Sequence, residues 1–498
     1  MSAVAGGEAK RVSSLPWIPI LIAAAAICIG AGILAGGAYA LAGLGGLIVF
    51  YVIARNPTFG LYLTTALLLL SGSSGILGIS SVGVPVTVAK ICGLMTFVAW
   101  ASGAVVRRKR FLLSGPLVFL LLFFAWVFFG TMRSTFRDEQ LPEYFRLGTL
   151  VVFFVMTVHL LDSWEKAHRY VVVIASCGIV MAAFAVYQYF SPSEYLAGES
   201  GIADIGAGTE GAFVDVDSLE GGPAIRVSGR AGHSNWLAMI LLLLFPLNVY
   251  WYNTAQHWQT RWLAVCATVI ELLALVFTFT RTGLIVGVTI LTAVTLLRQV
   301  RITPQRVSAA ALALVIAWFI LPDAYKERVL MFHQYTGSES VNYRVQLQQA
   351  AVEMTAENPV LGTGIGGFGL RLLDRGSEVS DILRWLVDRL NWNPVFYGTH
   401  NMYLQLSSET GLVGLGLMLV FFALLVRGIR NARRNYMETG DTRAAALAAA
   451  VEVSLMSFLL CAVFLHALQQ KIWWMIAALA TVIPGFTNSS PARVERDA

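Results

Sequence analysis

Hydrophobic residues along the chain gather in runs of about twenty, the length that an α-helix needs to cross a lipid bilayer. Short polar segments separate these runs. The pattern predicts an all-α fold, a polytopic helical bundle of about 12–14 transmembrane helices. Fourteen candidate spans begin near residues 16, 37, 59, 85, 111, 143, 168, 231, 261, 282, 304, 400, 443 and 470.

Basic residues indicate how these spans are oriented. With both termini in the cytoplasm, 20 lysine and arginine residues fall in short cytoplasmic segments and seven in short external ones. This asymmetry follows the positive-inside rule and predicts an even number of spans with both termini inside. The seven external residues are Arg133, Arg137, Arg146, Arg226, Arg230, Arg281 and Lys471.

Two external segments are long. Residues from about 191 to 230 are acidic and glycine-rich, and residues 323–399 form a loop longer than a connector needs. Within the second loop, SVNYRVQLQQAAVEMTAENP predicts a helix that ends before Pro359, and SDILRWLVDRLNW fits an amphipathic helix on the membrane surface. We therefore divide the chain into residues 1–322 with eleven spans, a helical cap at 323–399, and residues 400–498 with the last spans and a cytoplasmic tail.

Composition agrees with a membrane protein. The chain is 57% hydrophobic and 13% charged, about half the charged fraction of a soluble domain. Its net charge of +6 follows from the basic cytoplasmic loops, so we expect no nucleic-acid partner. The five cysteines all lie in apolar runs, without the spacing of a zinc site, and indicate small core residues.

Five external arginines are candidates for binding an anion. Arg226 and Arg230 precede a span, Arg281 lies in the tight TRTG turn between two spans, Arg146 begins the sixth span, and Arg344 opens the loop helix. Guanidinium groups that converge at a membrane boundary favour a ligand with several negative charges, such as a pyrophosphate. Alternatively, Arg146, Arg226 and Arg230 mark the interface, and Arg344 is a solvated helix residue.

A His-Asn pair stands where the long loop meets the next apolar run. A neutral His400 imidazole is suited to accept a proton from an attacking hydroxyl, and Asn401 beside it is a candidate for substrate binding. The alternative for His400 is a helix cap, and His233 fits a packing or positioning role. Glu409 lies nine residues further along the helix, on roughly the opposite face, which argues against a His-Glu dyad.

The glycine-rich GTGIGGFG precedes this pair. It lacks both a preceding strand and the Lys-Ser/Thr ending of a nucleotide-binding loop. We expect a tight turn in which backbone approaches backbone.

Four motifs resemble the bacterial O-antigen ligase and polymerase family. They are RVSGRAGHSNWLA, FTFTRTGLIVG, YRVQLQQAAVEMTAENPVLGTGIGGFG and THNMYLQLSSETGLVGLG, in this order over roughly residues 220 to 425. The first motif has His-Ser-Asn where Pro-Asn is common after the glycine. A polar insert of about thirty residues separates the third motif from His400.

The resemblance implies a GT-C-like glycosyltransferase of the bacterial inner membrane, with its active site on the periplasmic side. Its donor would be an undecaprenyl-pyrophosphate-linked glycan and its acceptor a growing glycan or lipid A core; no cofactor or metal is expected. Arg226, Arg281 and Arg344 would bind pyrophosphate, helped less securely by Arg146 and Arg230, and His400 would orient or deprotonate the acceptor. Membrane lipid and polysaccharide export or chain-length proteins would be further partners.

The motifs leave ligase and polymerase open, with the number of spans slightly favouring a polymerase. A flippase or transporter for polyprenyl-linked sugars is the alternative from another class. The one-sided clustering of polar residues and the absence of an internal repeat argue against it. A scaffold without activity would leave His400 beside the arginines unexplained.

Overall fold

The computed structural model describes residues 37–70, 87–106, 113–191, 227–229, 231, 233–280, 283, 286–290, 319, 339–390 and 393–488. Every regular element in these residues is a helix, which confirms the predicted all-α class. The chain separates into two compact units, one made of Met1–Thr64 with Lys90–Lys109 and the other of Thr65–Ala89 with Arg110–Ala498. The candidate site lies in the second unit.

The first unit contains α2 (Gly37–Arg55), most of α4 (Val88–Val106) and the first half of α3 (Pro57–Leu70). Gly60 of α3 faces Thr96 of α4 so closely that a β-carbon would lie 2.5 Å from the Thr96 hydroxyl. That hydroxyl also donates to the carbonyl of Cys92 at 2.7 Å, so its hydrogen bond is satisfied within α4. The glycine thus allows the two helices to approach closely.

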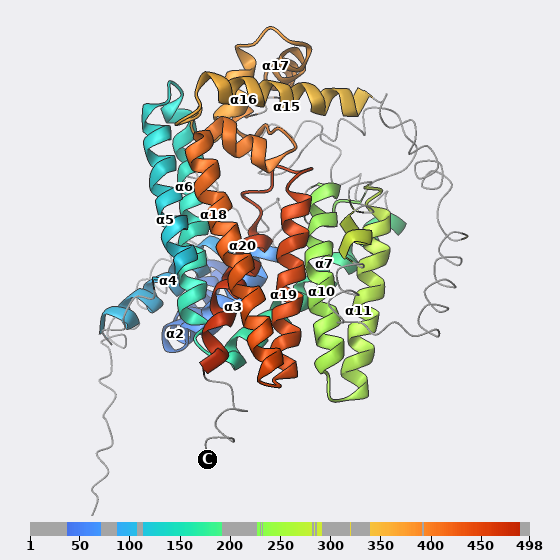
Figure 1. The fold of residues 1–498 in the computed structure, drawn as a ribbon. Coiled ribbons are helices and arrows are strands. Elements are labelled where there is room, and N and C mark those ends of the chain that lie inside the picture. Colours follow the sequence, from blue (N-terminus) through green and yellow to red (C-terminus); the bar gives the residue numbers. More distant parts are fainter. Residues whose placement is uncertain are drawn as a thin grey trace, which may run out of the picture. The chain divides into compact units, whose positions relative to one another are not determined.

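Among the residues that the structure describes, eight helices build the bundle of the second unit (Figure 1). α10 packs against both α11 and α19, α18 packs against α5 and α19, and α6 packs against α20. Large aromatic side chains fill the interior, and Trp473 and Trp474 of α20 are fully buried. The eight are α5 (Gly115–Arg133), α6 (Arg137–Leu160), α7 (Trp164–Phe190), α10 (Ser234–Thr254), α11 (Trp258–Phe277), α18 (Met402–Glu438), α19 (Thr442–Cys461) and α20 (Lys471–Val482).

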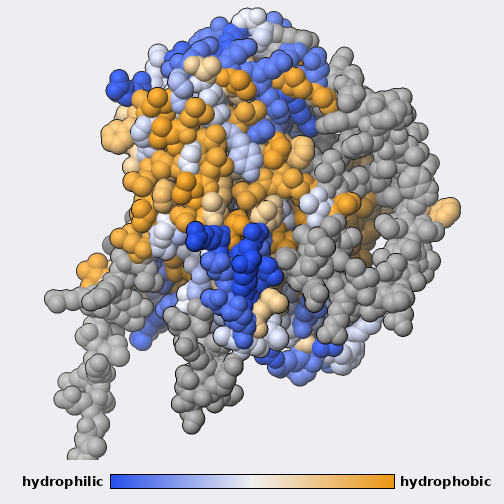
Figure 2. All heavy atoms as spheres, viewed as in Figure 1, coloured by the Kyte–Doolittle hydropathy of each residue, from blue (hydrophilic) through white to orange (hydrophobic). Residues whose placement is uncertain are grey.

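In the part of the chain that the structure describes, eight helices are long and apolar enough to cross a membrane. Figure 2 shows hydrophobic residues in a band between two hydrophilic ends. The protein is therefore a multi-pass membrane protein, as the hydrophobic pattern predicts. Eleven of the fourteen predicted spans correspond to a described helix. The candidate near residue 16 lies outside the described residues, and the candidates near 282 and 304 are described only in part.

Two helices extend beyond their apolar runs. α6 begins at Arg137 rather than near residue 143, so Arg146 lies inside the helix instead of at its start. α18 has 37 residues and continues into a basic segment. In both cases the helix continues past the hydrophobic stretch, and the first turn of α6 carries Asp138 and Glu139, whose negative charges favour a helix N-terminus.

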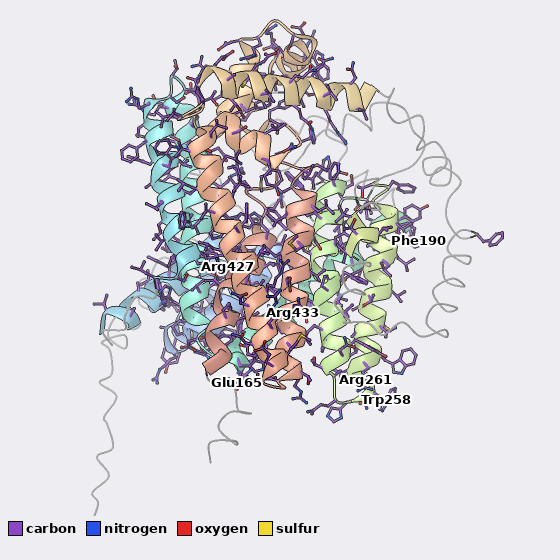
Figure 3. The ribbon with its side chains drawn as sticks, viewed as in Figure 1. Glu165, Phe190, Trp258, Arg261, Arg427 and Arg433 are labelled. Atoms are coloured by element: carbon purple, nitrogen blue, oxygen red, sulfur yellow. The ribbon has the colours of Figure 1, made fainter. Side chains whose placement is uncertain are left out.

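A helical cap covers one end of this bundle (Figure 1). It consists of α15 (Glu339–Glu357), α16 (Gly367–Leu373), α17 (Glu378–Leu390) and the short 3₁₀ helix η3 (Pro394–Phe396). Glu165, Trp258 and Arg261 lie at the opposite end (Figure 3). The separation agrees with the charge pattern, which assigns the cap and Arg261 to different sides. The division of the chain at residues 322 and 399 stays a prediction.

The cap has a hydrophobic core of its own, and this corrects one expectation. The apolar face of α17 was expected on the membrane surface, but Leu383 and Leu386 are buried against α15 and α16. Covering them inside the protein removes the apolar area that would attach the helix to lipid. The core comprises Leu347, Ala351, Met354, Phe368, Leu372, Leu383, Leu386 and Tyr397.

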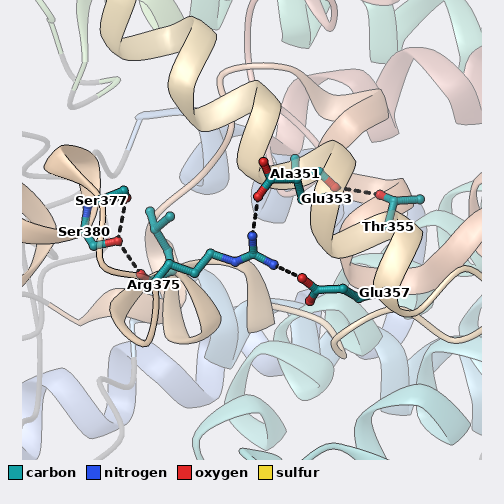
Figure 4. Close-up of polar contacts among 8 residues, drawn as sticks. Ala351, Glu353, Thr355, Glu357, Arg375, Ser377 and Ser380 are labelled. Atoms are coloured by element: carbon teal, nitrogen blue, oxygen red, sulfur yellow. Dashed lines mark hydrogen bonds and ion pairs between the residues drawn. The ribbon is translucent and has the colours of Figure 1, made fainter.

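Polar contacts fasten the cap helices to each other and to the bundle. Arg375, in the link between α16 and α17, forms ion pairs of 2.5 Å with both Glu353 and Glu357 of α15 (Figure 4). Thr355 of α15 lies 3.0 Å, hydroxyl to hydroxyl, from Ser407 of α18. The cap is thereby held directly over the first turns of α18, where His400 and Asn401 lie.

Candidate functional site

The His400 turn is a strained backbone segment at the start of α18. His400 has a φ of 54°, in the left-handed region that residues with a side chain seldom adopt. Asn401 is the N-cap of α18, and its Oδ1 accepts hydrogen bonds from the amides of Tyr403 at 3.0 Å and Leu404 at 3.2 Å. The Thr399 hydroxyl donates to the Asn401 carbonyl at 2.6 Å. The structure thus gives Asn401 a capping function, while substrate binding by it stays a prediction.

His400 lies in an electropositive, water-poor environment. Its Nδ1 is buried and accepts no hydrogen bond from the described residues. Burial lowers the pKa of His400 well below its ordinary value, and the charge of Arg344 and the imidazoles of His466 and His233 act in the same direction. The imidazole is therefore neutral at pH 7 and able to accept a proton.

His466 is a site residue that the sequence interpretation missed. It lies in the link between α19 and α20, and its ring meets that of His400 at 5.5 Å between centroids and 82° between planes. Burial lowers the pKa of His466 to about 4, and His233 and Arg146 contribute to the shift. One signal was available, because His466 stands at the external end of a predicted span, as His400 does.

His233 joins the same cluster from α10. Its Nδ1 accepts from the amide of Asn235 at 3.1 Å, so it caps the helix, in agreement with its expected positioning role. The Trp236 ring lies between it and His466, 5.9 Å from the first and 6.1 Å from the second. The Trp236 indole therefore contacts two histidines, and one of them, His466, contacts His400 in turn.

Two of the five candidate arginines are described, and both act on these histidines. Arg344 reaches His400 electrostatically from α15, and Arg146 reaches His466 from α6. Arg146 forms a 2.9 Å ion pair with the buried Glu143, which also accepts a hydrogen bond from Gln469. Its guanidinium lies 5.0 Å from the centre of the Phe396 ring. Glu143 thus fixes Arg146 and offsets part of its charge.

Arg226, Arg230 and Arg281 lie outside the described residues. Their neighbours do have a defined place. The amide of Val227 donates to the carbonyl of Phe277 at 3.2 Å, and the amide of Gly229 donates to Oε1 of Gln188 at 2.8 Å. Residues 227–229 are therefore attached to the ends of α7 and α11, just before the His233 cap of α10.

The glycine-rich loop fills a break in α18. Gly411 has φ 68° and ψ −179°, which interrupts the helix and frees backbone groups inside the bundle. The loop satisfies them: the amides of Thr363 and Gly364 donate to the carbonyls of Ser408 and Glu409, each at 2.9 Å. The Leu412 amide donates to the Pro359 carbonyl at 2.7 Å. A broken membrane helix needs such partners.

The close approach requires glycine on both sides. A β-carbon on Gly411 would lie 2.0 Å from the carbonyl oxygen of Val360, and one on Gly362 would lie 2.4 Å from the carbonyl carbon of Glu409. The expectation of a tight turn between two backbones is therefore confirmed.

The glycine-rich loop binds the side chain of Glu409. Its carboxylate accepts hydrogen bonds from the amides of Gly366 and Phe368 and from Nε2 of Gln405. The backbone amides of the loop are thus occupied by a carboxyl group of the protein itself. Oε1 of Gln405 accepts from the amide of Thr399 at 2.8 Å, which links Glu409 to the His400 turn without a direct His-Glu dyad.

Comparison with known families agrees with this arrangement. Residues 264–419 match the family model described as O-antigen ligase. This segment of the chain is thus similar to the O-antigen ligase family, in agreement with the resemblance of the four motifs. The match supports a membrane glycosyltransferase of the O-antigen ligase type. No match was found among curated proteins.

The family match covers only part of the histidine cluster. It includes Arg281, Arg344, His400 and the glycine-rich loop, whereas Arg146, His233 and His466 fall outside residues 264–419. The tertiary structure therefore adds residues from α6, α10 and the α19–α20 link to the segment that the O-antigen ligase family shares.

Proposed function

We propose that this protein, which is similar to the O-antigen ligase family over residues 264–419, transfers a glycan from a polyprenyl pyrophosphate to a sugar hydroxyl of an acceptor, with His400 at the reacting centre. The observation that carries the proposal is the neutral, buried imidazole of His400 within electrostatic reach of Arg344, under the cap and inside the family match. A neutral imidazole can accept the proton of a hydroxyl nucleophile, and a guanidinium can bind a phosphate through charge-assisted hydrogen bonds.

The reaction balances with these groups alone. The acceptor hydroxyl oxygen forms a bond to the anomeric carbon of the donor sugar, while the bond from that carbon to the pyrophosphate oxygen breaks. His400 takes the hydroxyl proton. The electrons of the broken bond stay on the pyrophosphate oxygen, and the pyrophosphate leaves while still attached to its lipid. Because pyrophosphate is a good leaving group, positioning the substrates and neutralising the leaving charge provide most of the catalysis.

Arg344 and Arg146 support pyrophosphate binding beside the histidines. A pyrophosphate near them would offset the positive field that otherwise disfavours the imidazolium form of His400. Arg226, Arg230 and Arg281 are proposed for the same role from their motifs. The proposal includes the partners that the family resemblance implies: an undecaprenyl-pyrophosphate-linked donor and a glycan or lipid A core acceptor, with the active site on the periplasmic side of the inner membrane.

One assay separates the alternatives. The purified protein is mixed with undecaprenyl-pyrophosphate-linked glycan and either lipid A core or further donor, and product length is followed on a gel. A ladder identifies a polymerase, and a single shift of lipid A core identifies a ligase. No product with either acceptor, together with movement of the donor across a vesicle bilayer, would replace the proposal with a flippase.

Substitution of His400 tests the site itself. We expect His400→Ala to reduce transfer by at least about 100-fold, the usual contribution of a general base, with donor binding unchanged. Arg344→Ala should instead weaken donor binding. His257→Ala and Arg427→Ala are matched controls, because both side chains are exposed outside the His400 cluster. Full activity of His400→Ala would remove it from the mechanism.

A further inference from the structure

His466 lies at the centre of a junction between three segments. Its imidazole packs against the backbone of Gly398, where an added β-carbon would lie 2.5 Å from Cγ of His466. The His400 ring stands edge-on at 5.5 Å, and Trp236 of α10 stands at 71° and 6.1 Å. The ring is thus enclosed by Gly398, His400 and Trp236.

The same turn is attached to the helix that leads to His466. The amide of Met402 donates to the carbonyl of Ala462 at 2.8 Å, and the hydroxyl of Tyr403 donates to the carbonyl of Leu459 at 2.8 Å. His466 follows four residues after Ala462. The end of α19 therefore holds both the backbone of the His400 turn and the segment that carries His466.

His400 needs such support, because its left-handed backbone is unfavourable by about 1–3 kcal/mol and persists only where the surroundings impose it. The side-chain amide of Gln405 and the Thr399 hydroxyl fix the backbone on either side of His400. His466 instead makes packing contacts. Its ring lies against the backbone of Gly398 and against the His400 imidazole, which would accept the proton.

We propose that His466 is a positioning residue for His400. Its ring fixes the plane of the His400 imidazole through the edge-to-face contact, and its packing on Gly398 fixes the turn that carries His400. This inference rests on the proposed glycan transfer, in which His400 takes a proton from the acceptor. An imidazole displaced by about 1 Å loses roughly 100-fold in rate, because proton transfer requires the correct geometry.

Three variants test the proposal in the full-length protein. We expect His466→Ala to lower kcat roughly 100-fold, with the KM for the donor unchanged, since the arginines are untouched. His466→Phe retains a flat ring that packs on Gly398 and meets His400, so it should recover most of the activity. A purely chemical role of the His466 nitrogens predicts the reverse, with His466→Phe as inactive as His466→Ala, and would overturn the proposal.

Gly398→Ala provides an independent readout. In the wild-type background its β-carbon collides with His466 and should lower kcat to a similar degree. In a His466→Ala background the collision is absent, and Gly398→Ala should cause no further loss. This non-additivity identifies the contact itself. Additive losses in kcat would contradict the proposal.

Two controls separate the possible failures. Thermal unfolding of each detergent-solubilised variant shows whether the bundle has survived, and only variants that unfold near the wild-type temperature are compared. If the wild-type protein transfers no glycan, the proposed function fails. If it transfers glycan and His466→Ala is equally active, only the positioning role fails.

Discussion

At the scale of single residues, the site is defined by histidines that stay neutral beside arginines. His400 and His466 have lowered pKa values because burial and neighbouring positive groups disfavour the imidazolium form. Arg146 is moderated by Glu143, whereas Arg344 acts on His400 directly. Positive groups close to the histidines favour an anionic ligand, which agrees with a pyrophosphate-linked donor.

The pH dependence of transfer should reflect this arrangement. Because the pKa of His400 is lowered, the free enzyme keeps a neutral imidazole below pH 6.5, and kcat/KM should begin to fall only under that value. A bound pyrophosphate favours the charged imidazolium and raises the pKa. The acid limb of kcat should therefore lie at higher pH than that of kcat/KM. An acid limb of kcat/KM well above pH 6.5 would contradict the neutral His400.

At the scale of elements, the decisive feature is the break in α18. The glycine-rich loop supplies hydrogen bonds to the interrupted helix, and Glu409 in return binds the amides of that loop. Trp126 of α5 adds a hydrogen bond of 2.9 Å to the carbonyl of Thr410. The first turns of α18, which carry the His400 turn, are thereby fixed to the cap as well as to the bundle.

Gly411→Ala should disrupt this junction. Its backbone conformation alone costs about 1–3 kcal/mol for a residue with a side chain, and its β-carbon would overlap the Val360 carbonyl. We expect a lower unfolding temperature and reduced transfer. Gly416→Ala is the matched control on the same helix, since no atom lies within 4 Å of its β-carbon position, and it should be neutral or stabilising by up to about 1 kcal/mol. Equal behaviour of the two variants would argue against the junction.

At the scale of the whole molecule, a hydrophilic cap and a basic α18 end are separated by an apolar band (Figure 2). α18 carries Arg427, Arg430, Arg433 and Arg434 in its second half. Glu452 of α19 binds the second and third of these arginines, at 2.9 and 2.7 Å. By the positive-inside rule, this concentration of basic residues predicts that the cap lies on the side away from the cytoplasm.

Cysteine labelling tests this orientation. Trp385 in the cap is 50% exposed and Met437 at the far end of α18 is 64% exposed. In cells with a permeabilised outer membrane, Trp385→Cys should react with a membrane-impermeant maleimide, and Met437→Cys should react only after lysis. The wild-type protein gives the background from its five native cysteines. The opposite pattern would reverse the topology and exclude a periplasmic site.

The sequence by itself determined that the protein is an all-α membrane protein, placed eleven of its spans on helices that the structure describes, and predicted a tight glycine turn before His400. These predictions depend on local properties of the chain. The length of an apolar run and the backbone conformations that glycine allows can both be read from a few neighbouring residues. Only the tertiary structure decided what surrounds His400. Arg146, His233 and His466 come from segments far apart in the chain, and no periodicity connects them. It also decided that α17 covers the cap core and that Glu409 occupies the glycine-rich loop, because burial and backbone satisfaction depend on neighbours that the linear sequence does not specify.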